Sequence, residues 1–185
     1  MIFKGTATAL ITPFTEDDKV DVQAIRNIVD VQIANGINAL VALGTTGEPA
    51  TLSEEEKEQI VRVCVEQTSG KIPLIVGAGS NSTRQAVETC RMAQKLGADA
   101  LLVVTPYYNK CTQEGLVEHY GAIAEATSLP IICYNVASRT GVNILPETFA
   151  RIATEHKNVV AIKEASGNME QIERCLRLCP DMVIS

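Results

Sequence analysis

Short runs of branched apolar residues recur along the chain, separated by longer stretches in which apolar positions follow helical spacing. Continuous apolar runs of this length are typical of strands that are buried on both faces, as in a parallel sheet covered by helices. The pattern therefore predicts seven buried strands, at residues 7–11, 39–43, 73–76, 100–104, 130–134, 159–163 and 182–185.

The stretches between these runs carry signals for the starts and ends of helices. Ser53 followed by Glu56 is a capping box, in which hydroxyl and carboxylate satisfy free amides of the first turn. Gly97 stands where a left-handed residue ends a helix, and Pro180 is expected to end the last one. Further predicted helix starts are Ser82 or Thr83, Thr112, the Leu145-Pro146 step and Asn168. Strands and helices therefore alternate, which indicates an α/β protein.

The spacing of the strands points to one architecture within that class. The ends of the first six runs lie 28 to 34 residues apart, and a (β/α)8 barrel of about 250 residues allots about 31 residues to each unit. An open, doubly wound sheet is the alternative, but no run is followed by a dinucleotide or P-loop glycine motif. We therefore predict an incomplete (β/α)8 TIM barrel, a single domain over residues 1–185 with about six βα units and the start of strand seven.

Composition and charge narrow the classes of partner and cellular location. The net charge of -6 disfavours nucleic acid and anionic membranes, which require clustered positive charge. No apolar run reaches the ~20 residues of a membrane span, and the first residues do not resemble a secretion signal. The six cysteines form no C-x-x-C pair and are expected to be thiols of a reducing cytoplasm. The two histidines have no partner at ligand spacing, so a metal centre is not expected. No cofactor is expected either.

Catalytic groups of such barrels gather where the strands end. Lys163 ends the sixth run, where removal from water would favour a neutral amine that attacks a carbonyl; the alternative is a lysine reaching into solvent. Tyr134 ends the fifth run, where its phenol would relay protons. The alternative is a core tyrosine whose hydroxyl group is bonded to the backbone. Thr45 and Thr46 follow the second run, either as part of a hydroxyl network or as a plain turn.

Two more candidates lie in the loops that follow the fourth and fifth runs. Arg139 presents a planar guanidinium suited to a substrate carboxylate, the alternative being a solvated loop arginine. Tyr107 and Tyr108 are adjacent tyrosines at the predicted barrel mouth, a position typical of contact with another chain or a ligand. Surface aromatics are the alternative for this pair.

Taken together, the loop motifs resemble the dihydrodipicolinate synthase family of pyruvate-dependent class I aldolases, which includes N-acetylneuraminate lyase. The motifs are GTTGE at 44–48, TPYYNK at 105–110, YNVASRTG at 134–141 and IKEASGN at 162–168. The resemblance runs along the whole chain, in order. GTTGE, Tyr108 and Arg139 favour a synthase over the lyase.

The resemblance implies an enzyme, a lyase that condenses pyruvate with L-aspartate 4-semialdehyde in lysine and diaminopimelate biosynthesis. Lys163 would form a Schiff base with pyruvate. Tyr134 would be the general acid and base, linked through Thr45 to Tyr108 in a proton relay. In the family, the tyrosine that matches Tyr108 comes from the neighbouring subunit of a dimer, and two dimers form a homotetramer.

The same resemblance assigns the two carboxylate-binding roles. Thr46 would hold the carboxylate of pyruvate, and Arg139 would bind that of the semialdehyde. The family continues for about another hundred residues, as a full barrel of about 250 or more residues plus a helical region needs. Two hypotheses stay open: an enzyme completed structurally by oligomerisation, or a catalytically inactive fragment or assembly element of the family.

Overall fold

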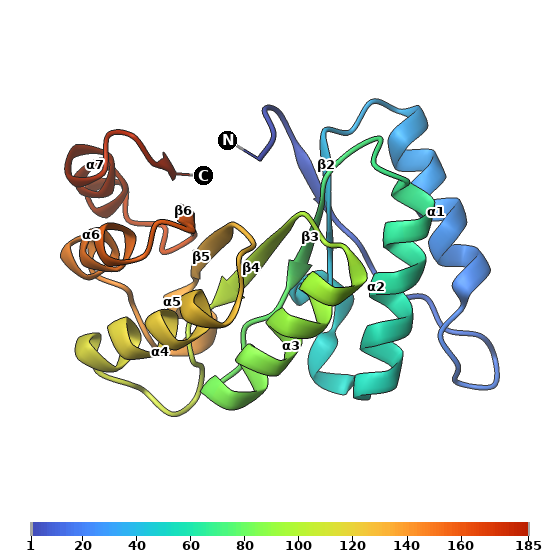
Figure 1. Ribbon diagram of the computed structural model, residues 1–185, viewed down its shortest axis with the longest axis horizontal. Helices are drawn as coiled ribbons and strands as arrows, with labels where there is room; N and C mark the ends of the chain where they lie inside the picture. Colours follow the sequence, from blue (N-terminus) through green and yellow to red (C-terminus); the bar gives the residue numbers. More distant parts are fainter. Residues whose placement is uncertain (1, 185) are drawn as a thin grey trace. The chain divides into compact units, whose positions relative to one another are not determined.

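The computed structural model describes residues 2–184, which form parallel strands alternating with helices (Figure 1). In chain order the elements are β1 (Ala7–Ala9), α1 (Val22–Ala34), β2 (Ala39–Ala42), the 3-10 turns η1 (Thr45–Gly47) and η2 (Pro49–Thr51), α2 (Glu54–Thr68), β3 (Leu74–Gly77), α3 (Thr83–Leu96), β4 (Ala100–Val104), α4 (Gln113–Ala126), β5 (Ile131–Asn135), α5 (Ala137–Thr140), α6 (Pro146–Glu155), β6 (Val159–Glu164), α7 (Met169–Leu178) and β7 (Val183–Ile184). All seven predicted strands are confirmed, and Ser185 of the last predicted run lies outside the described residues.

The described chain divides into two units. Unit 1 holds residues 2–77 and 92–101, and unit 2 holds residues 78–91 and 102–184. In unit 1, β1, β2 and β3 are parallel neighbours in chain order, with Ala7 opposite Ala39 and Leu40 opposite Leu74. Helix α1 packs against α2, and α2 packs against β2 and β3 (Figure 1). The core of this unit is aliphatic, and Leu40 and Leu74 are fully buried in it.

In unit 2 the end of β4, from Leu102 on, and the strands β5, β6 and β7 also follow chain order. Strand β6 pairs in parallel with β5 on one side and with β7 on the other. Helix α4 packs against α6, and α6 packs against α7 and β6 (Figure 1). The largest side chains buried between these elements are Tyr120, Phe149, Leu116, Ile123, Ile131, Ile144, Ile152 and Ile162. The single predicted domain stays a prediction, since each unit is described by itself.

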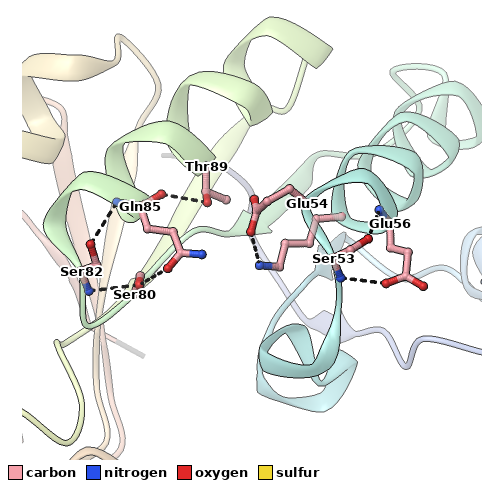
Figure 2. A network of polar contacts seen from close by, with 8 residues as sticks. Ser53, Glu54, Glu56, Ser80, Ser82, Gln85 and Thr89 are labelled. Carbon is pink, nitrogen blue, oxygen red and sulfur yellow. Dashed lines mark hydrogen bonds and ion pairs between the residues drawn. The ribbon is translucent and has the colours of Figure 1, made fainter.

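Helix starts follow the sequence signals closely. The Ser53 backbone N–H donates to Glu56 Oε2 at 2.8 Å and the Glu56 N–H donates to Ser53 Oγ at 3.2 Å, which completes the predicted capping box (Figure 2). Thr112 and Asn168 cap α4 and α7 with their side chains, and Pro146 opens α6. These contacts satisfy amides that would otherwise lack a partner at the first turn.

The start of α3 is held by a separate set of polar contacts. The Ser82 N–H donates to Ser80 Oγ at 3.1 Å, and the Gln85 N–H donates to Ser82 Oγ at 3.4 Å (Figure 2). Ser80 Oγ in turn donates to Gln85 Oε1 at 3.2 Å. The helix therefore begins at Thr83, where the sequence predicted Ser82 or Thr83.

Two details differ from the sequence prediction. Strand β1 ends at Ala9 rather than at Ile11, which is 57% exposed. The segment that carries Arg139 is not an irregular loop, because residues 137–140 form the single turn α5. The N–H groups of Arg139 and Thr140 both donate to the Val136 carbonyl, and these local bonds are sufficient to close one turn.

The six cysteines are free thiols, of which five are buried and Cys111 is partly exposed. Burial raises the pKa of Cys64 and of Cys90 to about 12, so both stay protonated and unreactive at neutral pH. Within residues 2–184, the helices are too short or too polar to cross a membrane.

His119 gives the fold a predicted sensitivity to acid. Its Nδ1 lies 2.9 Å from Thr83 Oγ1, and its buried Nε2 has no hydrogen-bond partner in the described part of the chain. Burial lowers the pKa of His119 to about 4. Because the unfolded chain binds this proton near pH 6.5, the free energy of unfolding is expected to fall as pH drops from 6.5 towards 4, by up to about 3 kcal/mol.

Urea denaturation between pH 7 and pH 4.5 measures this dependence. A His119→Gln variant, whose amide does not titrate, should lose it, whereas a His156→Gln variant should keep it. A free energy of unfolding that stays constant for the unaltered chain between pH 6.5 and pH 4.5 would contradict the prediction.

Candidate active site

Tyr134 and Lys163 lie side by side at the carboxyl ends of β5 and β6. The two residues are directly opposite each other in the strand register, so their side chains leave the same face of the sheet. The Lys163 Nζ lies 4.4 Å from the centroid of the Tyr134 ring, which is cation–π distance. An amine and a phenol therefore meet at the end of the sheet where barrel enzymes place their catalytic groups.

A one-residue bulge in β6 creates this pairing. Ile131 lies opposite Val159, but the next residue, Ile132, lies opposite Ala161. The extra residue, Val160, advances β6 by one position relative to β5. Without this bulge Tyr134 would face Ile162, because a shift of one residue turns every side chain to the other face.

The two side chains differ in exposure, and one expectation from the sequence is wrong. Tyr134 is buried, with 8% of its surface exposed, as expected for the end of a buried strand. Lys163 is exposed rather than removed from water. Pairing of β6 with β7 is described as far as Ile162 opposite Ile184.

Behind this pair, on the opposite face of the same two strands, lies a buried polar pair that the sequence reasoning missed. Asn135 and Glu164 are directly opposite each other and are 0% and 7% exposed. Asn135 Nδ2 donates to both carboxylate oxygens of Glu164, at 3.1 and 2.9 Å. The Ser166 N–H and Gln171 Nε2 also donate to this carboxylate, at 2.8 and 2.9 Å.

The buried pair connects the strand ends to the segment that follows α5. The Ile144 N–H donates to Asn135 Oδ1 at 3.0 Å, and Asn135 Nδ2 donates to Asn143 Oδ1 at 2.7 Å. Asn143 Nδ2 donates to Gln171 Oε1 at 2.8 Å, which extends the network into the first turn of α7. Asn135 and Glu164 lie inside two of the sequence motifs quoted above, each directly after Tyr134 or Lys163. That position is the feature of the sequence that could have pointed to them.

Arg139 and Tyr108 belong to the same unit and lie on connected segments. Arg139 is exposed in α5, and the Tyr108 N–H donates to the carbonyl of Thr140, its neighbour, at 3.2 Å. Tyr108 is 87% exposed and has a φ of +72°, an unusual conformation for a residue with a side chain. Such a costly conformation is found where surrounding contacts or function require it.

Thr45 and Thr46 lie in unit 1, in the turn η1. Both are exposed, and the turn is closed by the Gly47 N–H, which donates to the Gly44 carbonyl at 2.8 Å. Thr12 Oγ1 donates to the Gly47 carbonyl at 2.7 Å and anchors the turn to the segment after β1. The predicted relay and carboxylate-binding roles of the two threonines stay predictions.

The described side chains offer no metal centre. Across residues 2–184, histidines, cysteines and carboxylates do not come together in groups of three or more that could hold an ion.

Comparison with known proteins gives one consistent result. Residues 2–184 match the Dihydrodipicolinate synthetase family. The chain is 53% identical over 182 residues to a 4-hydroxy-tetrahydrodipicolinate synthase of Geotalea daltonii, which is 98% of this chain and 62% of that protein. The crystal structure of dihydrodipicolinate synthase from Thermotoga maritima superimposes with a TM-score of 0.94 at 49% identity, covering 100% of this chain and 63% of that one.

A further solved structure, of a dihydrodipicolinate synthase variant described as monomeric, has a TM-score of 0.94 at 50% identity, over 99% of this chain and 62% of that one. These likenesses confirm the predicted α/β fold of the TIM-barrel family. The chain spans about 62% of the length of the curated relatives it matches. On the match over residues 2–184 and on these identities, the chain belongs to the dihydrodipicolinate synthetase family.

Proposed function

We propose that the chain carries the catalytic groups of a 4-hydroxy-tetrahydrodipicolinate synthase, a lyase that condenses pyruvate with L-aspartate 4-semialdehyde in lysine and diaminopimelate biosynthesis. The observation that carries the proposal is the 4.4 Å approach of the Lys163 amine to the Tyr134 ring at the carboxyl ends of β5 and β6. The name borne by the relatives at 53% identity supports the same reaction.

In the proposed reaction the amine of Lys163 attacks the keto carbon of pyruvate and forms a carbinolamine. Tyr134 donates a proton to the departing hydroxyl group, which leaves as water, and a C=N bond replaces the C=O bond. The Tyr134 phenolate left by that transfer then takes a proton from the methyl group, which gives an enamine whose carbon attacks the aldehyde of the second substrate. The approach of the Lys163 amine to the Tyr134 ring supports the first of these proton transfers.

The remaining candidates supply binding and relay. Thr46 holds the carboxylate of pyruvate, and Arg139 binds that of the semialdehyde, for which a planar guanidinium offers two parallel donors. Thr45 links Tyr134 to Tyr108 in a proton relay. The 87% exposure and positive φ of Tyr108 support a role for its ring in contact with another subunit.

We further propose a cytoplasmic homotetramer, a dimer of dimers, in which Tyr108 is lent to the neighbouring site. Nucleic acid and membranes are not proposed as partners, in keeping with a net charge of -6. One similar structure is of a variant described as monomeric, so the oligomeric state is a property to be measured by sedimentation.

A second function is supported by a different observation. Lys163, Thr45, Thr46 and Arg139 are all exposed in the described chain, whereas catalytic groups gain strength from exclusion of water. The alternative is a catalytically inactive piece of the family, or an assembly element. An N-acetylneuraminate lyase activity is less well supported, because the relatives compared above are named synthases.

Treatment with pyruvate and sodium borohydride separates the two candidates. The active chain should gain a reduced pyruvate adduct on the peptide that contains Lys163, found by mass spectrometry after digestion. Lys157, an exposed lysine just before β6, is the internal control and should stay unmodified. An unmodified Lys163 in a chain shown to be folded by circular dichroism would favour the inactive candidate.

A further inference from the structure

The carboxylate of Glu164 occupies a position that neither the sequence motifs nor the proposed reaction explains. Glu164 lies opposite Asn135 in the register, one residue after the opposed pair Tyr134 and Lys163. Because side chains alternate along a strand, the pair Asn135–Glu164 lies directly behind the proposed catalytic pair, on the other face of the sheet. We propose that Glu164 is a positioning residue that holds Lys163 and Tyr134 in their relative geometry, an inference that rests on the proposed function.

The bonding of this carboxylate determines the orientation of the whole network. Its donors are all neutral: Asn135 Nδ2, Gln171 Nε2 and the Ser166 N–H. A carboxylate only accepts hydrogen bonds, so both amide side chains must turn their NH2 groups towards it. Asn135 Oδ1 is then free to accept from the Ile144 N–H.

The same logic applies to the second amide. With its Nε2 directed at Glu164, Gln171 presents Oε1 to Asn143 Nδ2 at 2.8 Å. Asn143 Oδ1 accepts from Asn135 Nδ2 and from Gln171 Nε2, at 2.7 and 3.1 Å. One acceptor-only group therefore sets the direction of three amide side chains, and a glutamine in its place would present a donor to at least one of them.

Three segments are joined at this carboxylate, the end of β5, the end of β6 and the first turn of α7. The segment after α5 is joined through Asn135, which accepts from the Ile144 N–H. The bulge at Val160 sets the backbone register that brings Lys163 opposite Tyr134. Catalytic groups need to be held within about 0.5 Å of their productive geometry, by side chains whose own positions are fixed by packing and hydrogen bonds. Burial of Glu164 and Asn135, at 7% and 0% exposure, meets that condition.

The test compares three variants in the 185-residue chain. Glu164→Gln removes the acceptor-only group, and Glu170→Gln makes the same change at an exposed position of α7. The double variant Asn135→Asp with Glu164→Gln, called the exchanged pair, exchanges donor and acceptor between the two positions. Two readouts are combined: hydrogen exchange at the amides of Ile144 and Ser166 without pyruvate, and the rate of borohydride trapping at Lys163 across pyruvate concentrations.

For Glu164→Gln we expect faster exchange at both amides and a trapping rate at saturating pyruvate about 100-fold lower, the cost of a displacement of about 1 Å. The pyruvate concentration for half-maximal trapping should stay unchanged, because the carboxylate-binding groups are not altered. In the exchanged pair the trapping rate should recover at least half of this loss, measured on a logarithmic scale. Glu170→Gln should trap pyruvate at the rate of the unaltered chain.

Other outcomes overturn the proposal in distinguishable ways. If Glu164→Gln traps pyruvate at the rate of the unaltered chain despite faster hydrogen exchange, the network has no positioning role. Equal losses in Glu164→Gln and in the exchanged pair, in parallel with their thermal stability, would reduce Glu164 to a structural residue. If the unaltered chain forms no adduct, the proposed function fails and the positioning role with it, while unchanged exchange in Glu164→Gln would instead refute the network alone.

Discussion

A Lys163→Met variant is expected to form no adduct with pyruvate and to lose synthase activity completely. Methionine keeps an unbranched side chain of similar length but has no nitrogen to attack the keto carbon. Because Lys163 is exposed, the free energy of unfolding should stay within about 0.5 kcal/mol of the unaltered value. Mass spectrometry after borohydride reduction, with urea denaturation of the same sample, measures both quantities.

Lys157→Met is the matched control for this experiment, since it removes an exposed lysine next to the same strand. It should trap pyruvate like the unaltered chain. A reduced adduct on any residue of Lys163→Met, at the rate of the unaltered chain, would show that another amine carries the reaction.

Tyr134→Phe should retain folding but trap pyruvate about 10² to 10⁴ times more slowly, the usual contribution of a positioned general acid or base. Phenylalanine keeps the ring that lies 4.4 Å from the Lys163 amine and removes only the hydroxyl group. The loss should appear in the limiting rate at saturating pyruvate, because the proton is needed when the carbinolamine loses water. Rapid-quench trapping with borohydride measures this rate.

Tyr120→Phe serves as the control for the loss of a buried phenol. Its hydroxyl group donates to the Val103 carbonyl at 2.8 Å, so its removal should lower stability by about 1 kcal/mol without slowing the trapping of pyruvate. Trapping by Tyr134→Phe at the rate of the unaltered chain would exclude the phenol as the proton donor.

The strands and helix starts could be predicted because their causes are local. The run 100–104 is found as β4 with the same bounds, and Ser53 and Glu56 form their capping box within four residues of chain. Such signals depend on side chains and backbone groups of the same short segment. The turn α5 was missed because no cap or apolar repeat marks a helix of four residues.

The candidate site was predicted in its members but not in its environment. Tyr134 and Lys163 were found because both end apolar runs, and the structure places them side by side. The exposure of Lys163 was predicted wrongly, since access of water to a strand end depends on how other segments pack around it. Polar residues at strand ends are ordinarily solvated, so the buried contact between Asn135 and Glu164 could not be distinguished from a solvated pair.

The amino-acid sequence by itself determined the alternation of strands and helices, the family, and the side chains available for chemistry. These properties reside in local patterns and in residue identity. Only the tertiary structure decided that a bulge at Val160 brings Lys163 opposite Tyr134, and that the carboxylate of Glu164 is enclosed behind them. Strand register and burial depend on contacts between segments about 30 residues apart, where a shift of one residue would send the amine to the other face of the sheet.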